Sequence, residues 1–291
     1  MPVRHYLAGM QWKEAAGVLR AACVHQSEGE CSEVLRRVGE ELSGKTMLQL
    51  RSSPETDLPE GRIREIAEAL QRDEPLQYIL GFEWFGPLRI AVGPGVLIPR
   101  PETEELVHWI RQEYAGSENL RVLDAGTGSG CIALLLKHFF PTWEICAGDV
   151  SPVALDYTGR NASALGLDIK PFRLNLLDPG TFPAVRFDLM VSNPPYVTPA
   201  EGEEMDGRVL DHEPHLALFV SNNDPLQFYK ALLDLAEKVL VPGGSLFLES
   251  GSVHAHEVAD CMQRAGYHTE LRKDMYGQPR MIRAVKAATR P

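Results

Sequence analysis

The tetrapeptide Asn193-Pro194-Pro195-Tyr196 has the groups needed to bind a planar amide or aromatic-amine NH2. The Asn193 side-chain oxygen and the Pro194 carbonyl can each accept one N–H of such a group, and the two prolines remove competing backbone donors. Pro195 has a fixed φ, and Tyr196 offers a ring face. Because the lone pair of such a nitrogen is delocalised, it attacks a sulfonium methyl only when held in line with it. The pattern therefore predicts N-methyl transfer, although the same four residues also fit a strand-ending turn.

A glycine-rich turn, Asp124–Gly130, lies about seventy residues earlier, between a strand-like run at 121–124 and an apolar helical run at 131–140. Glycines let the backbone approach a ligand closely, and a helix N-terminus presents free N–H groups to it. Asp149 lies nineteen residues past Gly130, at the end of the next predicted strand, where its carboxylate can accept both hydroxyls of a ribose. These features predict a site for an adenosine-containing cofactor.

The glycine turn alone does not identify the cofactor. Gly128-x-Gly130-x-x-Ala133 also satisfies the fingerprint of nicotinamide dinucleotide sites, so a dehydrogenase remains an alternative at this point. Asp124 favours a methyl donor, because a carboxylate before the turn can hold a cationic methionine amine directly or through water. Ligands of open α/β sheets bind at the carboxyl edge of the strands, so we expect Asn193 and Gly126 to face one crevice.

Alternating strand and helix patterns predict an α/β fold over residues 102–291, with a doubly wound, mostly parallel Rossmann-like sheet. The expected strands are 120–125, 143–148, 169–174, 187–192 and 245–250, and the expected helices lie near 102–114, 130–140, 152–165, 225–240 and 253–265. Two further strand-like runs, 268–274 and 280–286, are separated only by a turn around Gly277. Such a short connection requires antiparallel pairing, so we expect one antiparallel strand near the end of the sheet.

The preceding residues form two further predicted parts. Residues 1–74 show helical spacing of apolar residues and no catalytic cluster, which predicts a small helical domain, either a docking domain or a stabilising appendage. Residues 75–101 are punctuated by Gly and Pro around short strand-like pieces, which predicts a β-hairpin linker.

Composition limits the classes of partner. The 291 residues carry 40 acidic and 29 basic side chains, a net charge of −11, which disfavours duplex DNA as a partner. The five cysteines show no metal-binding spacing, and their odd number fits the reduced thiols of a cytoplasmic protein. We find no secretory signal and no apolar run of roughly twenty residues. The sequence therefore predicts a cytoplasmic monomer that uses no metal and does not bind a membrane.

Several stretches together are similar to one enzyme family, the peptide chain release factor N5-glutamine methyltransferases (the PrmC or HemK family). They are Glu74–Gly81, Val96–Glu105, Val122–Gly130, Val191–Tyr196 and Glu213–Leu218, and they cover residues 74 to about 250. The glycine turn is common to many methyltransferases, and the Asn-Pro-Pro-Tyr turn is shared with amide and adenine N-methylators. The Leu-Ile-Pro-Arg-Pro-Glu-Thr-Glu run, by contrast, is close to diagnostic.

The resemblance implies a reaction and its partners. The donor would be S-adenosyl-L-methionine, leaving S-adenosyl-L-homocysteine, and the acceptor would be the glutamine in the Gly-Gly-Gln motif of class I release factors. Asn193 and Pro194 would hold the glutamine amide beside Pro195, and Tyr196 would line its slot. The predicted cofactor residues are Asp124, Gly126, Thr127, Gly128, Ser129, Gly130, Asp149, Asn175, Leu176 and Asn193.

Within that set, the resemblance assigns Gly126–Gly130 to the methionine and ribose side, Asp149 to the ribose hydroxyls, and Asn175 with Leu176 to the adenine. Two departures from the family pattern are visible. Asn175 replaces the usual Asp after the third strand, and residues 220–226 replace a glycine-rich segment. The alternatives left open are methylation of another glutamine, as in a ribosomal protein, methylation of an exocyclic nucleic-acid amine, and a scaffold that only retains the cofactor pocket.

Overall fold

The structure, a computed structural model, describes residues 9–203, 205–220 and 224–287. The chain forms two compact units, residues 1–81 (the first unit) and residues 82–291 (the second unit). Part of the altered loop noted above, residues 221–223, lies outside the described residues.

The first unit is mainly helical. Its elements are β1 (Gly9–Gln11), α1 (Trp12–Ala22), α2 (Glu28–Ser43), α3 (Met47–Ser52), β2 (Asp57–Pro59), α4 (Glu60–Gln71) and α5 (Leu76–Leu80). Capping boxes at Ser27 and Thr46 begin α2 and α3, because each side chain accepts a backbone N–H three residues on. The helical character predicted for residues 1–74 is present in α1, α2 and α4, whereas the antiparallel pair β1–β2 was not predicted.

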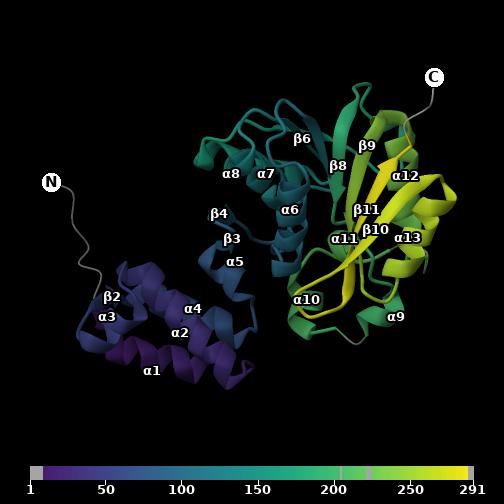
Figure 1. Ribbon diagram of the computed structural model, residues 1–291. Helices are drawn as coiled ribbons and strands as arrows, with labels where there is room; N and C mark the ends of the chain where they lie inside the picture. The colour runs from purple at the N-terminus through teal and green to yellow at the C-terminus, as the bar shows by residue number, and fades with distance from the viewer. Residues whose placement is uncertain (1–8, 204, 221–223, 288–291) are drawn as a thin grey trace. The chain divides into compact units, whose positions relative to one another are not determined.

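The second unit contains the predicted sheet (Figure 1). Its strands are β5 (Arg121–Ala125), β6 (Glu144–Asp149), β7 (Lys170–Arg173), β8 (Phe187–Ser192), β9 (Leu240–Glu249), β10 (Tyr267–Lys273) and β11 (Pro279–Lys286). The spatial order is β10-β11-β9-β8-β5-β6-β7. Only β11 runs against its neighbours in this sheet, pairing antiparallel with both β9 and β10. The predicted fold, mostly parallel with one antiparallel strand near the end, is confirmed.

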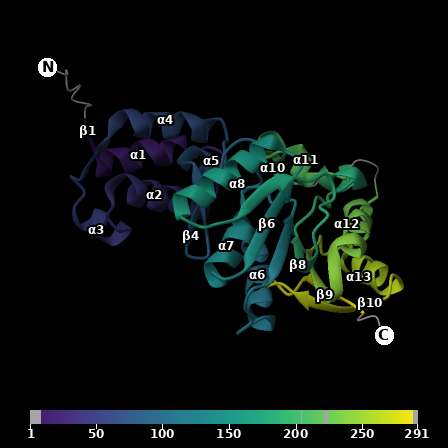
Figure 2. The same cartoon turned by 90° about the horizontal axis from the view of Figure 1, so that it is seen from above.

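Helices cover both faces of this sheet. Figure 2 shows α6 (Pro101–Glu113), α7 (Cys131–Phe139) and α8 (Pro152–Leu165) on one face, and α12 (Gln227–Val239) and α13 (Ala255–Arg264) on the other. Each of these five helices was predicted. Residues 122–125 of β5 are buried without alternation, as expected for a parallel strand covered on both sides.

Strand β9 begins five residues earlier than predicted, at Leu240 instead of residue 245. Gly243 and Gly244, expected to end the preceding helix, lie inside this strand. A Cβ on Gly244 would stand 2.9 Å from the Val241 carbonyl oxygen and 3.1 Å from that of Asp188. The glycine is therefore required by a close backbone approach where β8 and β9 shift register, and not by a helix end.

The predicted hairpin forms in the second unit, as β3 (Phe82–Phe85) and β4 (Leu88–Ala91). Asn161 of α8 holds it: the Ala91 N–H donates to Asn161 Oδ1 at 2.8 Å, and Asn161 Nδ2 donates to the Ala91 carbonyl at 3.1 Å. The described residues between β8 and α12 include the short helices α9 (Pro199–Gly202), α10 (Gly207–His212) and α11 (His215–Leu218).

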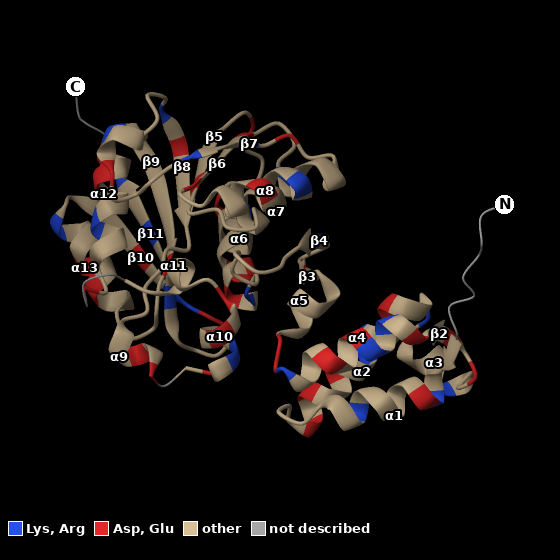
Figure 3. Ribbon diagram, turned by 180° about the vertical axis from the view of Figure 1, so that it is seen from behind, with Lys and Arg blue, Asp and Glu red and all other residues tan. Residues whose placement is uncertain are grey.

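Acidic and basic residues are intermixed along the helices of the first unit (Figure 3). Several form ion pairs along one helix, such as Arg64 with Glu60 on α4 and Arg36 with Glu33 and Glu40 on α2. These helices therefore carry no continuous basic stripe of the kind that binds a nucleic-acid backbone.

Candidate active site

Parallel pairing of β5 and β8 brings the two main motifs to one edge of the sheet. Asp124 lies opposite Val191 in this register, so Gly126 and Asn193 each follow two residues later along the same direction. The Ser192 hydroxyl strengthens the junction by donating to the Ala125 carbonyl at 2.5 Å. The structure thus brings together two motifs that are about seventy residues apart in the sequence, as the sequence analysis expected.

The glycine turn has a backbone that only glycine adopts readily. Gly126, Gly128 and Gly130 have φ values of +83°, +58° and +84°, all in the left-handed region. The turn is tied to the next strand, because the N–H groups of Gly126 and Thr127 donate to the Gly148 carbonyl at 2.8 and 3.0 Å. It leads directly into α7, whose N-cap is Gly130.

Asp149 lies at the end of β6 with a fixed carboxylate. Its Oδ2 accepts the Gly128 N–H at 2.9 Å, and its Oδ1 accepts the Ser151 N–H at 2.8 Å. Burial raises the pKa of Asp149, and the backbone donors at Ser151 and Gly128 oppose that rise. Each oxygen keeps a second acceptor site, so an oriented pair of acceptors remains for two donors of a ligand.

Asp124 lies behind the turn and is fully buried. Its Oδ2 accepts the Thr127 hydroxyl at 2.6 Å and the Ala133 N–H at 3.2 Å, whereas its Oδ1 is buried with no hydrogen-bond partner. Burial raises the pKa of Asp124 to about 7, and the hydrogen bonds from Thr127 and Ala133 act in the opposite direction. An unpaired buried carboxylate oxygen is uncommon, and it suits a cationic or water partner.

Two cavities of the second unit meet at Asn193. The first has a volume of about 260 Å³ and extends from Asn193 to the glycine turn and Asp149. The second, of about 320 Å³, is lined by Pro194 and Tyr196. The residues common to both linings are Leu97, Arg100, Asn193 and Ala217. We call the first cavity the donor cavity and the second the acceptor cavity.

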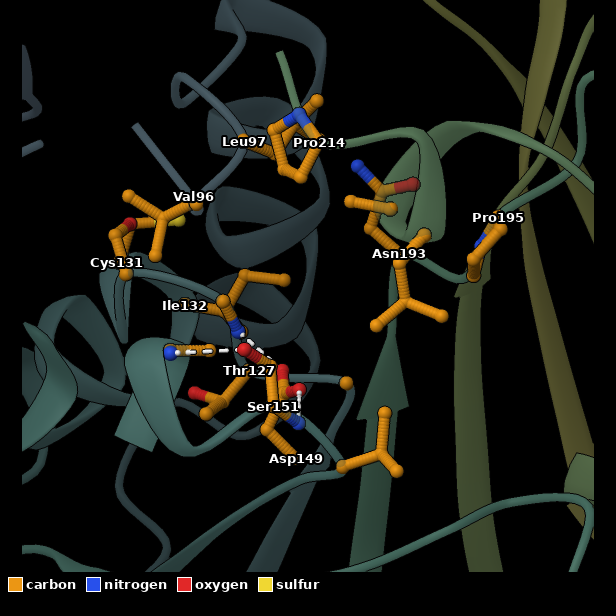
Figure 4. Close-up of a pocket in the computed structure, with 18 of the residues that line it drawn as sticks. Val96, Leu97, Thr127, Cys131, Ile132, Asp149, Ser151, Asn193, Pro195 and Pro214 are labelled. Carbon is orange, nitrogen blue, oxygen red and sulfur yellow. Dashed lines mark hydrogen bonds between the residues drawn. The ribbon is translucent and has the colours of Figure 1, made fainter. Parts of the chain in front are cut away.

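Figure 4 shows the donor cavity, with Asn193 and Pro195 at the tip of strand β8, facing Val96 and Cys131. Thr127, Asp149 and Ser151 lie at its opposite end. The predicted residues Asn175 and Leu176 also line it. Asn175 Oδ1 accepts the N–H of Leu177 at 3.1 Å, so this oxygen is already used to shape the turn after β7.

The Asn193 amide is held from behind by two residues that the sequence analysis did not assign to the site. Asn193 Nδ2 donates to Thr103 Oγ1 at 3.0 Å, and the Thr103 hydroxyl donates to Glu249 Oε2 at 2.6 Å. Thr103 comes from α6 and Glu249 from the end of β9. Burial raises the pKa of Glu249 to about 7, against the opposing effects of Thr103 and Arg280.

A buried carboxylate also anchors the loop between the two cavities. Glu213 accepts the Ile98 N–H at 3.0 Å with one oxygen and pairs with the Arg100 guanidinium through the other. This ion pair fixes the loop 96–100, which contributes Leu97 and Arg100 to both cavities. Arg100 and Glu213 were both visible in the family-like stretches, but their pairing across more than one hundred residues was not predictable from either stretch alone.

Tyr196 forms part of the wall of the acceptor cavity. Its ring packs so closely against Gly251 that a Cβ there would stand 3.1 Å from Tyr196 Cδ2. Burial and the nearby Glu249 raise the pKa of Tyr196 to about 12, with Arg280 opposing them, so the phenol is neutral near pH 7. A neutral phenol can pack against an uncharged amide without introducing a charge.

Metal centres and membrane spans are further classes of feature that the described part of the chain could contain. Among these residues, no group of three or more His, Cys, Asp or Glu is arranged to hold a metal ion. No helix within them has the length and apolar character needed to cross a membrane.

The chain has clear relatives among known proteins. Residues 103–211 match the family model "Methyltransferase small domain". The chain is 36% identical over 275 residues to a release factor glutamine methyltransferase of Lactococcus lactis, covering 94% of this chain and 99% of that protein. It is 42% identical over 218 residues to the protein of the same name from Flavobacterium psychrophilum, covering 74% and 76% of the two chains.

Among solved structures, a methyltransferase from Pyrococcus furiosus superposes with a TM-score of 0.52 at 20% identity, covering 69% of this chain and 90% of that one, which supports the fold. The sequence identity of these two relatives, and the share of each chain that it covers, establish homology. The chain belongs to the release factor glutamine methyltransferase family.

Proposed function

We propose that this protein transfers a methyl group from S-adenosyl-L-methionine to the side-chain nitrogen (N5) of the glutamine in the Gly-Gly-Gln motif of class I release factors. One observation carries the proposal most directly. Asn193 lies where the donor and acceptor cavities meet, with its amide nitrogen bound to Thr103 and its oxygen without a hydrogen bond to any described residue. An NH2 group of a second molecule can therefore donate a hydrogen bond to that oxygen. The names of the similar proteins point to the same acceptor.

The residues of the donor cavity fit S-adenosyl-L-methionine. Asp149 offers two oriented acceptors, which suit the hydroxyls of a ribose. Asn175 and Leu176 would bound the adenine, and the glycine turn would lie against the methionine and ribose part. Asp124 does not itself line the donor cavity, but Thr127, which donates to it, does; the one unpaired buried oxygen of Asp124 would hold the methionine amine directly or through water. When bound, the cofactor supplies an electrophilic methyl group on a positively charged sulfur.

On the acceptor side, Asn193 Oδ1 and the Pro194 carbonyl would each accept one N–H of the glutamine amide, while Pro195 stiffens the turn and Tyr196 lines the slot. These two acceptors orient the nitrogen lone pair towards the donor cavity, so alignment contributes much of the rate. The N–H protons become more acidic as the new bond forms, and both hydrogen bonds strengthen at that stage. Transition-state stabilisation is thus assigned to groups that already have their final geometry.

The atoms of the reaction balance without a metal or a redox partner. A C–N bond forms between the methyl carbon and the glutamine nitrogen as the methyl–sulfur bond breaks, and S-adenosyl-L-homocysteine leaves with the bonding electron pair. The positively charged amide nitrogen then loses one proton to water. No side chain needs to act as a base before the attack, so His212 and His215 are not assigned that role.

The first unit, which includes the helical part predicted at 1–74, has no catalytic role in this proposal, and we assign it to docking of the release factor. The predicted catalytic part at 102–291 carries the chemistry, together with the loop 96–100 that follows the hairpin linker. A glutamine on an exposed loop can enter the acceptor cavity directly. A base in duplex DNA would first have to be flipped out of the helix, which costs a few kcal/mol. We further propose a cytoplasmic monomer that acts on a protein and not on DNA, in keeping with the net charge of −11.

Replacing Asn193 by Ala tests the acceptor assignment. Asn193→Ala should reduce the single-turnover rate of methyl transfer by roughly 10²-fold or more, the scale of losing one preorganised polar contact in a transition state. Thermal unfolding followed by circular dichroism should match that of the wild type. A single-turnover rate close to that of the wild type would remove the acceptor role of Asn193.

Replacing Asp149 tests the cofactor assignment. Asp149→Ala should weaken binding of S-adenosyl-L-methionine by about 1 to 3 kcal/mol in titration calorimetry, as expected for lost hydrogen bonds to a charged group. Asp156→Ala is the matched control, because Asp156 is an exposed acid on α8 that forms an ion pair with Arg160. Tight binding of NADH with no binding of S-adenosyl-L-methionine by the wild type would instead indicate a dehydrogenase.

Removing the first unit tests its docking role. A chain of residues 82–291 should bind S-adenosyl-L-methionine and methylate a short Gly-Gly-Gln peptide at the rate of the full chain, but should lose most of its activity on an intact release factor. The peptide serves as the control, because it makes no contacts away from the acceptor cavity. Equal rates of both chains on the intact factor would contradict the docking role.

A further inference from the structure

The orientation of the Asn193 amide is set by a buried chain of hydrogen bonds. Asn193 Nδ2 lies 3.0 Å from Thr103 Oγ1, which lies 2.6 Å from Glu249 Oε2. Thr103 is 3% exposed and Glu249 1% exposed, so water does not compete freely for either side chain. The three residues come from the turn after β8, from α6 and from β9, which are far apart in the sequence. The relative positions of the three side chains are therefore fixed by the fold of the second unit.

A hydroxyl has a single proton, and this fixes which group donates and which accepts in each of these hydrogen bonds. An ionised carboxylate only accepts hydrogen bonds, so the Thr103 proton must point towards Glu249. Thr103 Oγ1 can then only accept from Asn193, which must present its NH2 group to it. The Asn193 oxygen consequently points away from Thr103, the orientation that a glutamine NH2 requires.

Protonation of Glu249 would remove this constraint. A protonated carboxyl can donate to Thr103, which frees the Thr103 proton to donate to Asn193 and allows the amide to rotate by half a turn. The amide would then present its NH2 group to the substrate NH2, and neither could accept a hydrogen bond. The charge on Glu249 therefore decides which end of Asn193 faces the substrate.

Several charged or titratable groups surround Glu249 and bear on its ionisation. Arg280 of β11 and Arg100, at the N-cap of α6, favour its charged form, and Glu102 of α6 opposes it. The phenols of Tyr196 and Tyr229 and the thiol of Cys131 on α7 also lie within its electrostatic reach. The Tyr229 hydroxyl donates to the Glu249 backbone carbonyl at 3.1 Å, which helps to hold the end of β9.

We propose that Thr103 and Glu249 are positioning residues, which hold the Asn193 amide with its oxygen turned towards the substrate NH2. The inference rests on the proposed function of Asn193 as an acceptor, and it adds two residues whose effect is transmitted through that side chain. It also explains why a hydroxyl lies at position 103 and an acid at the buried end of β9.

Kinetics of Thr103 variants test the role of the hydroxyl. Thr103→Val keeps the branched shape and removes the hydroxyl, so it should lower kcat at least about 10-fold, the scale of one hydrogen bond, with a smaller change in KM for the release factor. Thr103→Ser retains the hydroxyl and should restore most of the rate. Thr142→Val, on an exposed loop, is the matched control. A Val variant as fast as the wild type, or a Ser variant as slow as the Val variant, would overturn the proposal.

The pH dependence tests the role of Glu249. In the wild type kcat should rise with pH as Glu249 ionises, with a midpoint near its pKa of about 7. Glu249→Gln, which is neutral at every pH, should be slower on the alkaline side and should lack this rise. A rise that is unchanged in Glu249→Gln would belong to another group, such as Asp124, and would overturn the role of Glu249.

A measurement on the protein alone, with no methyl-accepting substrate present, separates this proposal from the proposed function. The side-chain amide signals of Asn193 in a ¹⁵N NMR spectrum, assigned by their loss in Asn193→Ser, should shift with pH in the wild type and stay constant in Glu249→Gln. Signals that titrate identically in both proteins would overturn the proposal, whatever the acceptor is. Absence of methyl transfer to a release factor by the wild type would refute only the proposed function.

Discussion

The parallel pairing of β5 with β8 is the constraint on which the rest of the site depends. It places the glycine turn and the Asn-Pro-Pro-Tyr turn at the same carboxyl edge, so that the donor cavity and the acceptor cavity share Asn193 in their linings. Such a pair cannot be joined by a tight turn, and the connection from β5 to β8 contains α7 and α8, which cover one face of the sheet. The sheet edge therefore determines the geometry of the reaction before any side chain contributes.

The site is supported by buried polar groups that a merely stable fold would not need. Asp124, Glu213 and Glu249 are carboxylates buried in the second unit, and burying such a group is costly unless it finds partners. Glu213 has the Arg100 guanidinium and a backbone N–H, and Glu249 has the Thr103 hydroxyl. Asp124 keeps one oxygen unpaired. Asp124 binds Thr127, which lines the donor cavity, and Glu249 binds Thr103, which lines it too. Glu213 fixes the loop 96–100, which contributes to both cavities.

Much of the fold was predictable because its signals are local. The strands at 121–125 and 187–192, the helix of α8 after Ser151-Pro152 and the hairpin all depend on runs of apolar residues and on nearby turn residues. The early start of β9 was not predictable, since Gly244 is required by the distant carbonyl of Asp188. Within the site, Asn193 and Asp149 could be selected by their places after strands. The link between Glu249 and Asn193 was not predictable, because only the folded sheet places Thr103 of α6 between them. An acid at the end of the apolar run of β9 was nevertheless a visible signal.

The central claim is that the amide nitrogen of one glutamine receives the methyl group. The most direct measurement is tandem mass spectrometry of a class I release factor after incubation with the full chain and S-adenosyl-L-methionine carrying an isotopically labelled methyl group. The account predicts label on the side-chain nitrogen of the Gly-Gly-Gln glutamine and none in duplex DNA or RNA present in the same reaction. Label on an exocyclic base amine, or only on a glutamine of a ribosomal protein included as a competitor, would contradict it.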